Sequence, residues 1–270
     1  MNNTTEKYSV TQYTVNSVLS FIDSGDIAIP EIQRPFVWKG RQVRDLIDSL
    51  YNGYPTGYLI IWQNPDVKLK NGESSVGKKI LTDGQQRVTA LQAAIAGMEV
   101  TDSNYRKKPI KIAFNPLTET FEVCNPAIEK DTKWIPDISK VFEATFEEFP
   151  FIISYCATNG LTGQESAVAK TISKLKKVLD INIGVTDLNQ SLSIDEVTDI
   201  FIRINSQGVV LSQADFAMSK ISADDKYGGT EIRKMIDYFC HFMKRPADYD
   251  MIVSNDKAFA KSDALQKIKW

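Results

Sequence analysis

Histidine and cysteine are scarce in this chain, and their scarcity excludes several classes of metal site. Among 270 residues the only histidine is His241, and the three cysteines are Cys124, Cys156 and Cys240. A His-Cys zinc site or a two-histidine metallonuclease needs more imidazoles than one. We expect His241, which lies in an aromatic helical run, to be a packed residue. The widely spaced cysteines are typical of small core residues in a reducing compartment.

Long apolar runs and an excess of charge are also missing. No apolar run approaches the ~20 residues that a membrane span requires, and the polar N-terminal sequence lacks the apolar core of a signal peptide. The 32 basic and 34 acidic residues give a net charge of −2, so bulk charge does not indicate nucleic-acid binding. We therefore expect a cytoplasmic protein without a membrane partner, built as one large domain or two smaller ones.

Hydrophobic periodicity predicts an α/β fold with most of its strands in the first half. The elements expected there are helices over 15–22, 40–51 and from about 84, strands over 57–63 and 79–82, and a hairpin over 109–125. Those expected afterwards are helices over 146–160, 165–180, 193–208, 211–221 and 230–243, with one strand over 181–188. Ser193 and Glu196 have capping-box spacing. The change in composition suggests a boundary near residue 130, between regions 1–130 and 131–270.

The sequence LTDGQQRVTALQAAIAG places polar residues at the mouth of an apolar helix. Asp83 is a good N-cap, and Gln86 has the spacing of a capping box. Capping does not require Gly84, Gln85 or Arg87. A glycine lets a ligand approach the first-turn N–H groups, and the amides and guanidinium add donors for an anion. A capped helix and a phosphate site both remain open, and a valine at position 84 is expected to be awkward but tolerable for the backbone and to block a phosphate.

Two further segments are richer in polar side chains than their apolar surroundings require. IPEIQRPFVW contains Gln33 and Arg34 between two prolines, and FIRINSQG contains Arg203 and Asn205 at the end of an apolar helix. Turn hydrogen bonds would account for the first pair and helix termination for the second. With the helix mouth they provide three arginines and several amides, a set that suits a triphosphate. Asp83 would then orient Mg²⁺ or an attacking water.

A match to the phosphate-binding P-loop, GESSVGKK, is not expected to be functional. Lys79 stands where a Ser or Thr should hold magnesium, and the segment leads into a strand instead of a helix. A polar loop over residues 64–78 is the better interpretation.

Four motifs, IPEIQRPFVW, PTGYLIIW, LTDGQQRVTAL and FIRINSQGVVLS, occur here in the order and spacing of a widespread bacterial family. Over roughly residues 14–221 the chain resembles the N-terminal, GmrS-like domain of GmrSD-type modification-dependent restriction enzymes. Related phage-defence proteins in this family sense phosphorothioate DNA. The resemblance implies an α/β (α+β) fold, with a ParB/sulfiredoxin-like mixed-sheet core followed by a mainly helical region that carries FIRINSQG.

The resemblance also implies that the domain binds a nucleoside triphosphate with Mg²⁺ at DGQQR, hydrolyses it, and so controls DNA cleavage. Asp83 and Gln86 are the expected catalytic residues, with Asp83 also the magnesium ligand. The expected nucleotide-binding residues are Gln33, Arg34, Gly84, Gln85, Gln86, Arg87, Arg203 and Asn205. Cleavage in the family belongs to an HNH module, which one histidine cannot build. A separate HNH-type module or subunit is therefore the expected partner, and the chain alone should have no nuclease activity.

Two other functions remain open. One is a non-hydrolysing DNA-binding module, in which Phe36 and Trp38 help to read a modified base. The other is a nuclease, for which Asp224 and Lys226 form only a fragment of a site. Nucleotide turnover and DNA nicking by the purified chain separate the three functions. The oligomeric state also stays open, with a homo-oligomer among the alternatives.

Overall fold

The structure, a computed structural model, describes residues 6–29, 36–63, 79–102, 104–205 and 228–261. The chain divides into two compact units, and the described residues up to Leu192 belong to the first while those from Ser193 onward belong to the second. This division differs from the boundary near residue 130 that the composition suggested. The chain returns to the central sheet with strand β9 after the helices that follow residue 130, so strands far apart in sequence share one unit.

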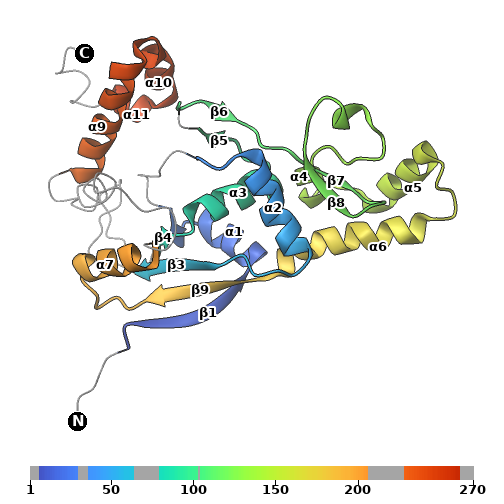
Figure 1. The fold of residues 1–270 in the computed structure, drawn as a ribbon, viewed down its shortest axis with the longest axis horizontal. Coiled ribbons are helices and arrows are strands. Elements are labelled where there is room, and N and C mark those ends of the chain that lie inside the picture. Colours follow the sequence, from blue (N-terminus) through green and yellow to red (C-terminus); the bar gives the residue numbers. More distant parts are fainter. Residues whose placement is uncertain (1–5, 30–35, 64–78, 103, 206–227, 262–270) are drawn as a thin grey trace. The chain divides into compact units, whose positions relative to one another are not determined.

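A five-stranded mixed sheet, in the order β1-β9-β3-β4-β2, forms the centre of the first unit (Figure 1). The strands are β1 (Tyr8–Thr14), β2 (Ile27–Ala28), β3 (Tyr58–Gln63), β4 (Lys79–Asp83) and β9 (Asn182–Leu188). The β1–β9 and β3–β4 pairs are antiparallel, whereas β9–β3 and β4–β2 are parallel. The mixed α/β class expected from the sequence is confirmed, and the strands expected near 57–63, 79–82 and 181–188 are all present.

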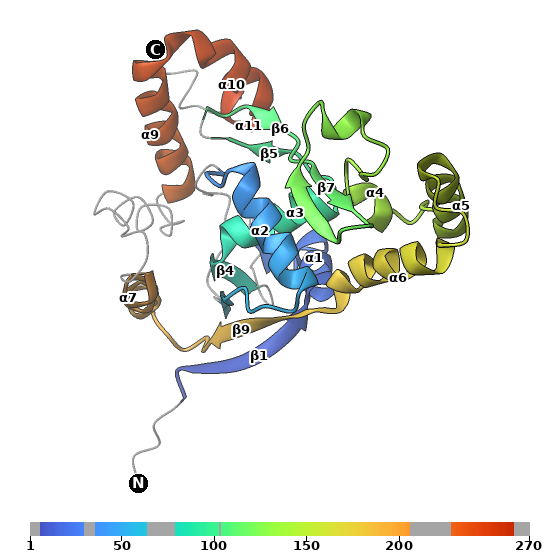
Figure 2. The ribbon, with the colours of Figure 1, turned by 45° about the vertical axis from the view of Figure 1, so that its right-hand side comes forward.

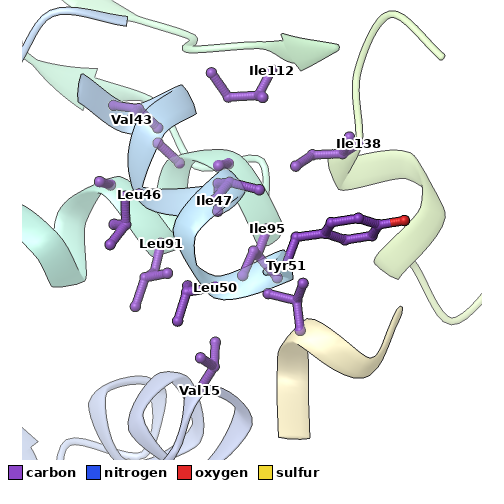
Figure 3. Packing of buried hydrophobic residues seen from close by; sticks show 14 of the residues in the cluster. Val15, Val43, Leu46, Ile47, Leu50, Tyr51, Leu91, Ile95, Ile112 and Ile138 are labelled. Carbon is purple, nitrogen blue, oxygen red and sulfur yellow. The ribbon is translucent and has the colours of Figure 1, made fainter. Parts of the chain in front are cut away.

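Helices α1 (Val15–Asp23), α2 (Gly40–Tyr51) and α3 (Gln85–Ile95) pack together through their apolar faces and agree with the predicted helices. The α2 residues predicted to share one face are all buried, namely Val43, Leu46, Ile47 and Leu50. Figure 3 shows these side chains in one cluster with Leu91 and Ile95 of α3, and Val15 of α1 lies beside Leu50. The core of the unit therefore lies between the helices and one face of the sheet.

Beyond α3 the first unit continues with two small antiparallel sheets and a group of helices (Figure 2). The elements are β5 (Val100–Thr101), β6 (Lys107–Lys108), β7 (Ile112–Asn115), β8 (Thr120–Val123), η1 (Ile128–Lys130), α4 (Ser139–Phe142), α5 (Glu148–Asn159), α6 (Glu165–Lys176) and η2 (Lys177–Asp180). The hairpin expected over 109–125 is confirmed as β7–β8, and α5 and α6 confirm the two helices expected after it. The β5–β6 pair was not expected.

The second unit contains helices in its described part: α7 (Ile194–Asn205), α9 (Gly229–Lys244), η4 (Pro246–Asp248), α10 (Tyr249–Asn255) and α11 (Lys257–Ala260). The capping box before α7 is confirmed, because the Ser193 N–H donates to Glu196 Oε2 at 3.0 Å and the Glu196 N–H donates to Ser193 Oγ at 3.3 Å. His241 Nε2 lies 2.9 Å from Asp248 Oδ2, and both side chains are largely buried, as expected for a packed histidine.

Two expected elements, the loop over 64–78 and the helix over 211–221, lie outside the described residues. Within the described ranges, no helix combines the length and apolar character that crossing a membrane requires.

Candidate functional site

The DGQQR sequence forms a turn from strand to helix, because β4 ends at Asp83 and α3 begins at Gln85. Gly84 is the N-cap, with φ +95° in the left-handed region that favours glycine, and it makes no side-chain capping bond. The prediction that Asp83 caps the helix, with Gln86 completing a capping box, is therefore wrong. Asp83 still pairs within the sheet, and the Gln86 amide oxygen accepts the N–H of Val37 at 3.0 Å.

Gly84 is also required by close packing. A Cβ atom at this position would lie 2.4 Å from Cδ2 of Leu59 and 3.5 Å from its Cα. The prediction that the backbone would tolerate a valine here is therefore wrong, since both the positive φ and the contact with β3 oppose any side chain. Glycine at position 84 follows from the fold, whatever ligand the turn binds.

The Arg87 side chain interacts with two other groups of the protein. Its Nη1 donates to the carbonyl oxygen of Thr56 at 3.1 Å, and its Nη2 lies 3.5 Å from Asp83 Oδ2. Gly57 makes room for the guanidinium, because a Cβ there would lie 2.9 Å from Nη1. Burial lowers the pKa of Arg87, and the negative charge of Asp83 opposes that shift. Arg87 therefore fastens the turn before β3 onto the start of α3.

The N-terminus of α3 has the features of an anion site, with one carboxylate beside it. The first-turn N–H groups of a helix carry its positive end, and the N-cap here contributes only backbone. The Gln85 side chain turns back toward the Leu81 carbonyl, with Nε2 3.4 Å from the oxygen. Asp83 keeps about a quarter of its side chain exposed (24%) and could meet a cation carried by such an anion.

As a magnesium ligand, Asp83 would act together with the phosphates of a bound ligand. Within the described ranges, no group of three or more His, Cys, Asp or Glu residues could hold a metal ion. Magnesium is commonly bound by one or two carboxylates plus substrate phosphates and water. A single carboxylate beside a phosphate site fits that pattern, whereas a metal site made of protein ligands alone does not.

Five of the predicted site residues come together in the β4–α3 turn, namely Asp83, Gly84, Gln85, Gln86 and Arg87. Gln33 and Arg34 lie outside the described residues. Arg203 is exposed in the last turn of α7, a helix that ends at Asn205 in the second unit, where a cation interacts favourably with the helix dipole.

Thr56 and Gly57 also belong to this site, although the sequence did not predict a role for them. The signal was present in the motif PTGYLIIW, but its glycine was assigned only to the start of a strand. The structure also corrects the idea that Phe36 helps to read a base. Phe36 is buried in the core, and its N–H donates to the carbonyl of Thr101 at 2.9 Å. Trp38 packs partly buried against the same core.

A mixed sheet packed against helices, with a glycine turn that opens a helix at the end of a strand, defines a mixed α/β domain. Residues 15–222 match the family model described as GmrSD restriction endonuclease, N-terminal domain. Since the match covers most of the chain, the chain belongs to this family and is a domain of a restriction system, which serves in phage defence. A search of curated proteins found no match.

Proposed function

We propose that this domain binds a nucleoside triphosphate at the β4–α3 turn, hydrolyses it, and thereby controls DNA cleavage by a separate HNH-type module. The observation that carries the proposal is the start of α3 directly after β4, where the carboxylate of Asp83 stands beside a helix N-terminus whose N-cap contributes only backbone. With glycine as the N-cap, the N-cap residue itself places no side chain over the first-turn backbone N–H groups of α3. Such a helix start suits a phosphate group.

Each residue of the turn has a distinct role in this proposal. The N–H groups around Gln85 and Gln86 bind the phosphates, and Asp83 would hold Mg²⁺, which would supply neutralising charge. Asp83 also orients the attacking water. The Val37 N–H donates a hydrogen bond to the amide oxygen of Gln86 and so fixes the orientation of the Gln86 side chain. In this orientation the Gln86 side chain lies beside the attacking water. Gln33, Arg34, Arg203 and Asn205 remain predicted phosphate-binding residues.

Arg87 contributes in a different way from the one its sequence position suggested. Its guanidinium is engaged by Thr56 and Asp83, so its first role is to position the turn that receives the phosphates. Its positive charge adds to the favourable potential at the helix start. We therefore assign Arg87 as a positioning residue of the nucleotide site.

DNA and an HNH-type nuclease module or subunit are the proposed macromolecular partners. Family membership supports both, because the family is a restriction system. We expect the purified chain not to nick modified or unmodified DNA with Mg²⁺ or Mn²⁺. Metal-dependent nicking that purifies with the chain and is lost in Asp224→Ala would contradict this assignment and would support the nuclease alternative.

Calorimetric titration with a non-hydrolysable triphosphate and Mg²⁺ tests the binding step. Hydrogen exchange on the same samples should show slowed exchange of the amides at Gln85 and Gln86, because these N–H groups would bind phosphate. If the common ribonucleoside triphosphates produced no heat of binding and no protection of the first turn of α3, the proposal would be wrong. Binding without phosphate release would instead favour the non-hydrolysing DNA-binding alternative.

A further inference from the structure

Strand β1 forms one edge of the central sheet. It stands at one end of the strand order, and within the described part of the chain only β9 pairs with it. Both views of the ribbon show β1 beside β9 at the margin of the sheet (Figures 1 and 2). The opposite edge, β2, is only two residues long, whereas β1 keeps seven consecutive paired residues. One edge strand of the sheet is therefore short and the other is long.

The residues of β1 itself carry none of the features of sequence and register that commonly prevent pairing with another strand. Natural edge strands are commonly short, bulged, or marked by charged residues or proline. The sequence of β1, YSVTQYT, contains no charged residue, no proline and no glycine. Its pairing with β9 runs from Tyr8 to Thr14 without a shift in register. The outer side of β1 thus presents a regular row of backbone donors and acceptors.

Apolar side chains extend this edge onto one face of the sheet. Tyr8 and Val10 are 57% and 58% exposed, and alternation along the strand places them on the same face as Gln12. Tyr58, 56% exposed, lies on that face too, because Gly184 is the partner of both Gln12 and Tyr58. The side chain of Tyr58 covers Gly184, where a Cβ would lie 2.6 Å from its ring.

We propose that β1 pairs antiparallel with β1 of a second copy of this chain and joins two central sheets in a symmetric dimer. A two-fold axis requires a surface complementary to itself, and a neutral strand meets no charge repulsion from its own copy. Pairing about Thr11 sets that residue opposite Thr11 of the partner subunit. Val10 then lies opposite Gln12 of the partner subunit. Threonine pairs across neighbouring strands are favourable, and no pair in this register opposes two like charges.

The dimer is independent of the proposed nucleotide function. Strand β1 ends at Thr14, before the residues 15–222 that match the family model, so the family match does not cover the pairing strand. No residue of the β4–α3 turn belongs to the pairing edge. Failure of nucleotide binding would therefore leave the dimer intact, and a monomeric chain would leave the nucleotide site intact.

Two variants that carry opposite charges at the two-fold axis test this pairing, and multi-angle light scattering measures their mass. The parent is expected at twice the 30.4 kDa mass of one chain. Thr11→Lys and Thr11→Glu should each be monomeric, because like charges would then face each other across the axis. An equimolar mixture of the two variants should restore the dimer. Thr158→Lys, the same change at an exposed site on α5, should remain dimeric.

Three results would overturn the pairing. They are a monomeric parent at high micromolar concentration, dimers that persist in both Thr11 variants, and variants that stay monomeric after mixing. Thr11 is exposed, so both variants should keep the thermal unfolding of the parent. Recovery of the dimer on mixing would also show directly that both variants are folded.

Discussion

Arg87 on α3 donates a hydrogen bond from Nη1 to the backbone carbonyl oxygen of Thr56, 3.1 Å away, and so joins two of the family motifs. PTGYLIIW supplies the carbonyl and DGQQR supplies the guanidinium. Gly57 is required between them, because its φ is +84° and a side chain there would meet Arg87. The two motifs therefore act as one structural unit at the mouth of α3.

Replacement of Arg87 by alanine should lower the free energy of unfolding by about 1.5–3 kcal/mol, the range for a lost hydrogen bond to a charged group. Thr56 would lose its donor, and Asp83 would lose its neighbouring cation. Urea denaturation measures the change. Triphosphate affinity should also fall, because the turn loses its anchor.

Arg41→Ala, a change at an exposed site on α2, is the control, and its free energy of unfolding should stay within about 0.5 kcal/mol of the parent. Equal stability of both variants would contradict the anchoring role.

Replacing each of two glycines by alanine separates the free-energy cost of backbone strain from the cost of a packing conflict. Gly160 ends α5 with φ +68° and has no atom within 4 Å of a built Cβ, so Gly160→Ala should cost about 1–2 kcal/mol from strain alone. Gly84→Ala adds the contact with Leu59 and should cost about 1–3 kcal/mol more. Denaturant unfolding of both variants gives the comparison. Equal costs would mean that Leu59 moves aside and that packing does not fix position 84.

The stability of the β7–β8 hairpin should depend on pH through Glu119. Lys174 Nζ at 2.8 Å and the Tyr51 hydroxyl at 2.7 Å both donate to Glu119 Oε2, and they hold the pKa of this carboxyl below its usual value. A lowered folded-state pKa stabilises the protein above the unfolded-state pKa, and the stabilisation is lost as pH falls through the folded-state pKa.

Glu119→Gln should therefore reduce the free energy of unfolding at pH 7 by roughly 0.5–1 kcal/mol, a range limited by solvent screening because the side chain is 46% exposed. The difference from the parent should shrink as pH falls below about 4, where the parent carboxyl also loses its charge. Urea titrations across this pH range measure it. A difference that stays constant with pH would show that charge on Glu119 is not the cause. Glu99→Gln, at an exposed site after α3, controls for the amide substitution.

Features that depend on neighbouring residues could be predicted from the sequence. The buried face of α2 follows from apolar residues at helical spacing, as at Val43 and Ile47. The capping box of Ser193 and Glu196 depends on two residues three positions apart. In both cases the interactions that decide the structure lie within one or two helical turns of the sequence.

Features that depend on distant residues could not be predicted in this way. Asp-Gly-Gln-Gln can begin a helix at Asp83 or at Gly84, and the choice is made by β3, where Ile60 pairs with Asp83 and Leu59 contacts Gly84. The Arg87 bond to Thr56 spans 31 positions, a separation at which no local pattern gives a signal. The division into units likewise depends on β9 pairing with β1 and β3.

The rate of phosphate release from a triphosphate with Mg²⁺ tests nucleotide turnover at the β4–α3 turn most directly. The three proteins to compare are the parent, Asp83→Asn and Asp180→Asn, where Asp180 is an exposed aspartate on η2. We predict that the parent releases phosphate and that Asp180→Asn does so at the same rate. In Asp83→Asn the rate should fall by about 100-fold or more, because the group that positions the attacking water is lost. Asparagine keeps the shape of the side chain, so the variant should stay folded. Equal rates of phosphate release by the parent and Asp83→Asn would contradict the account.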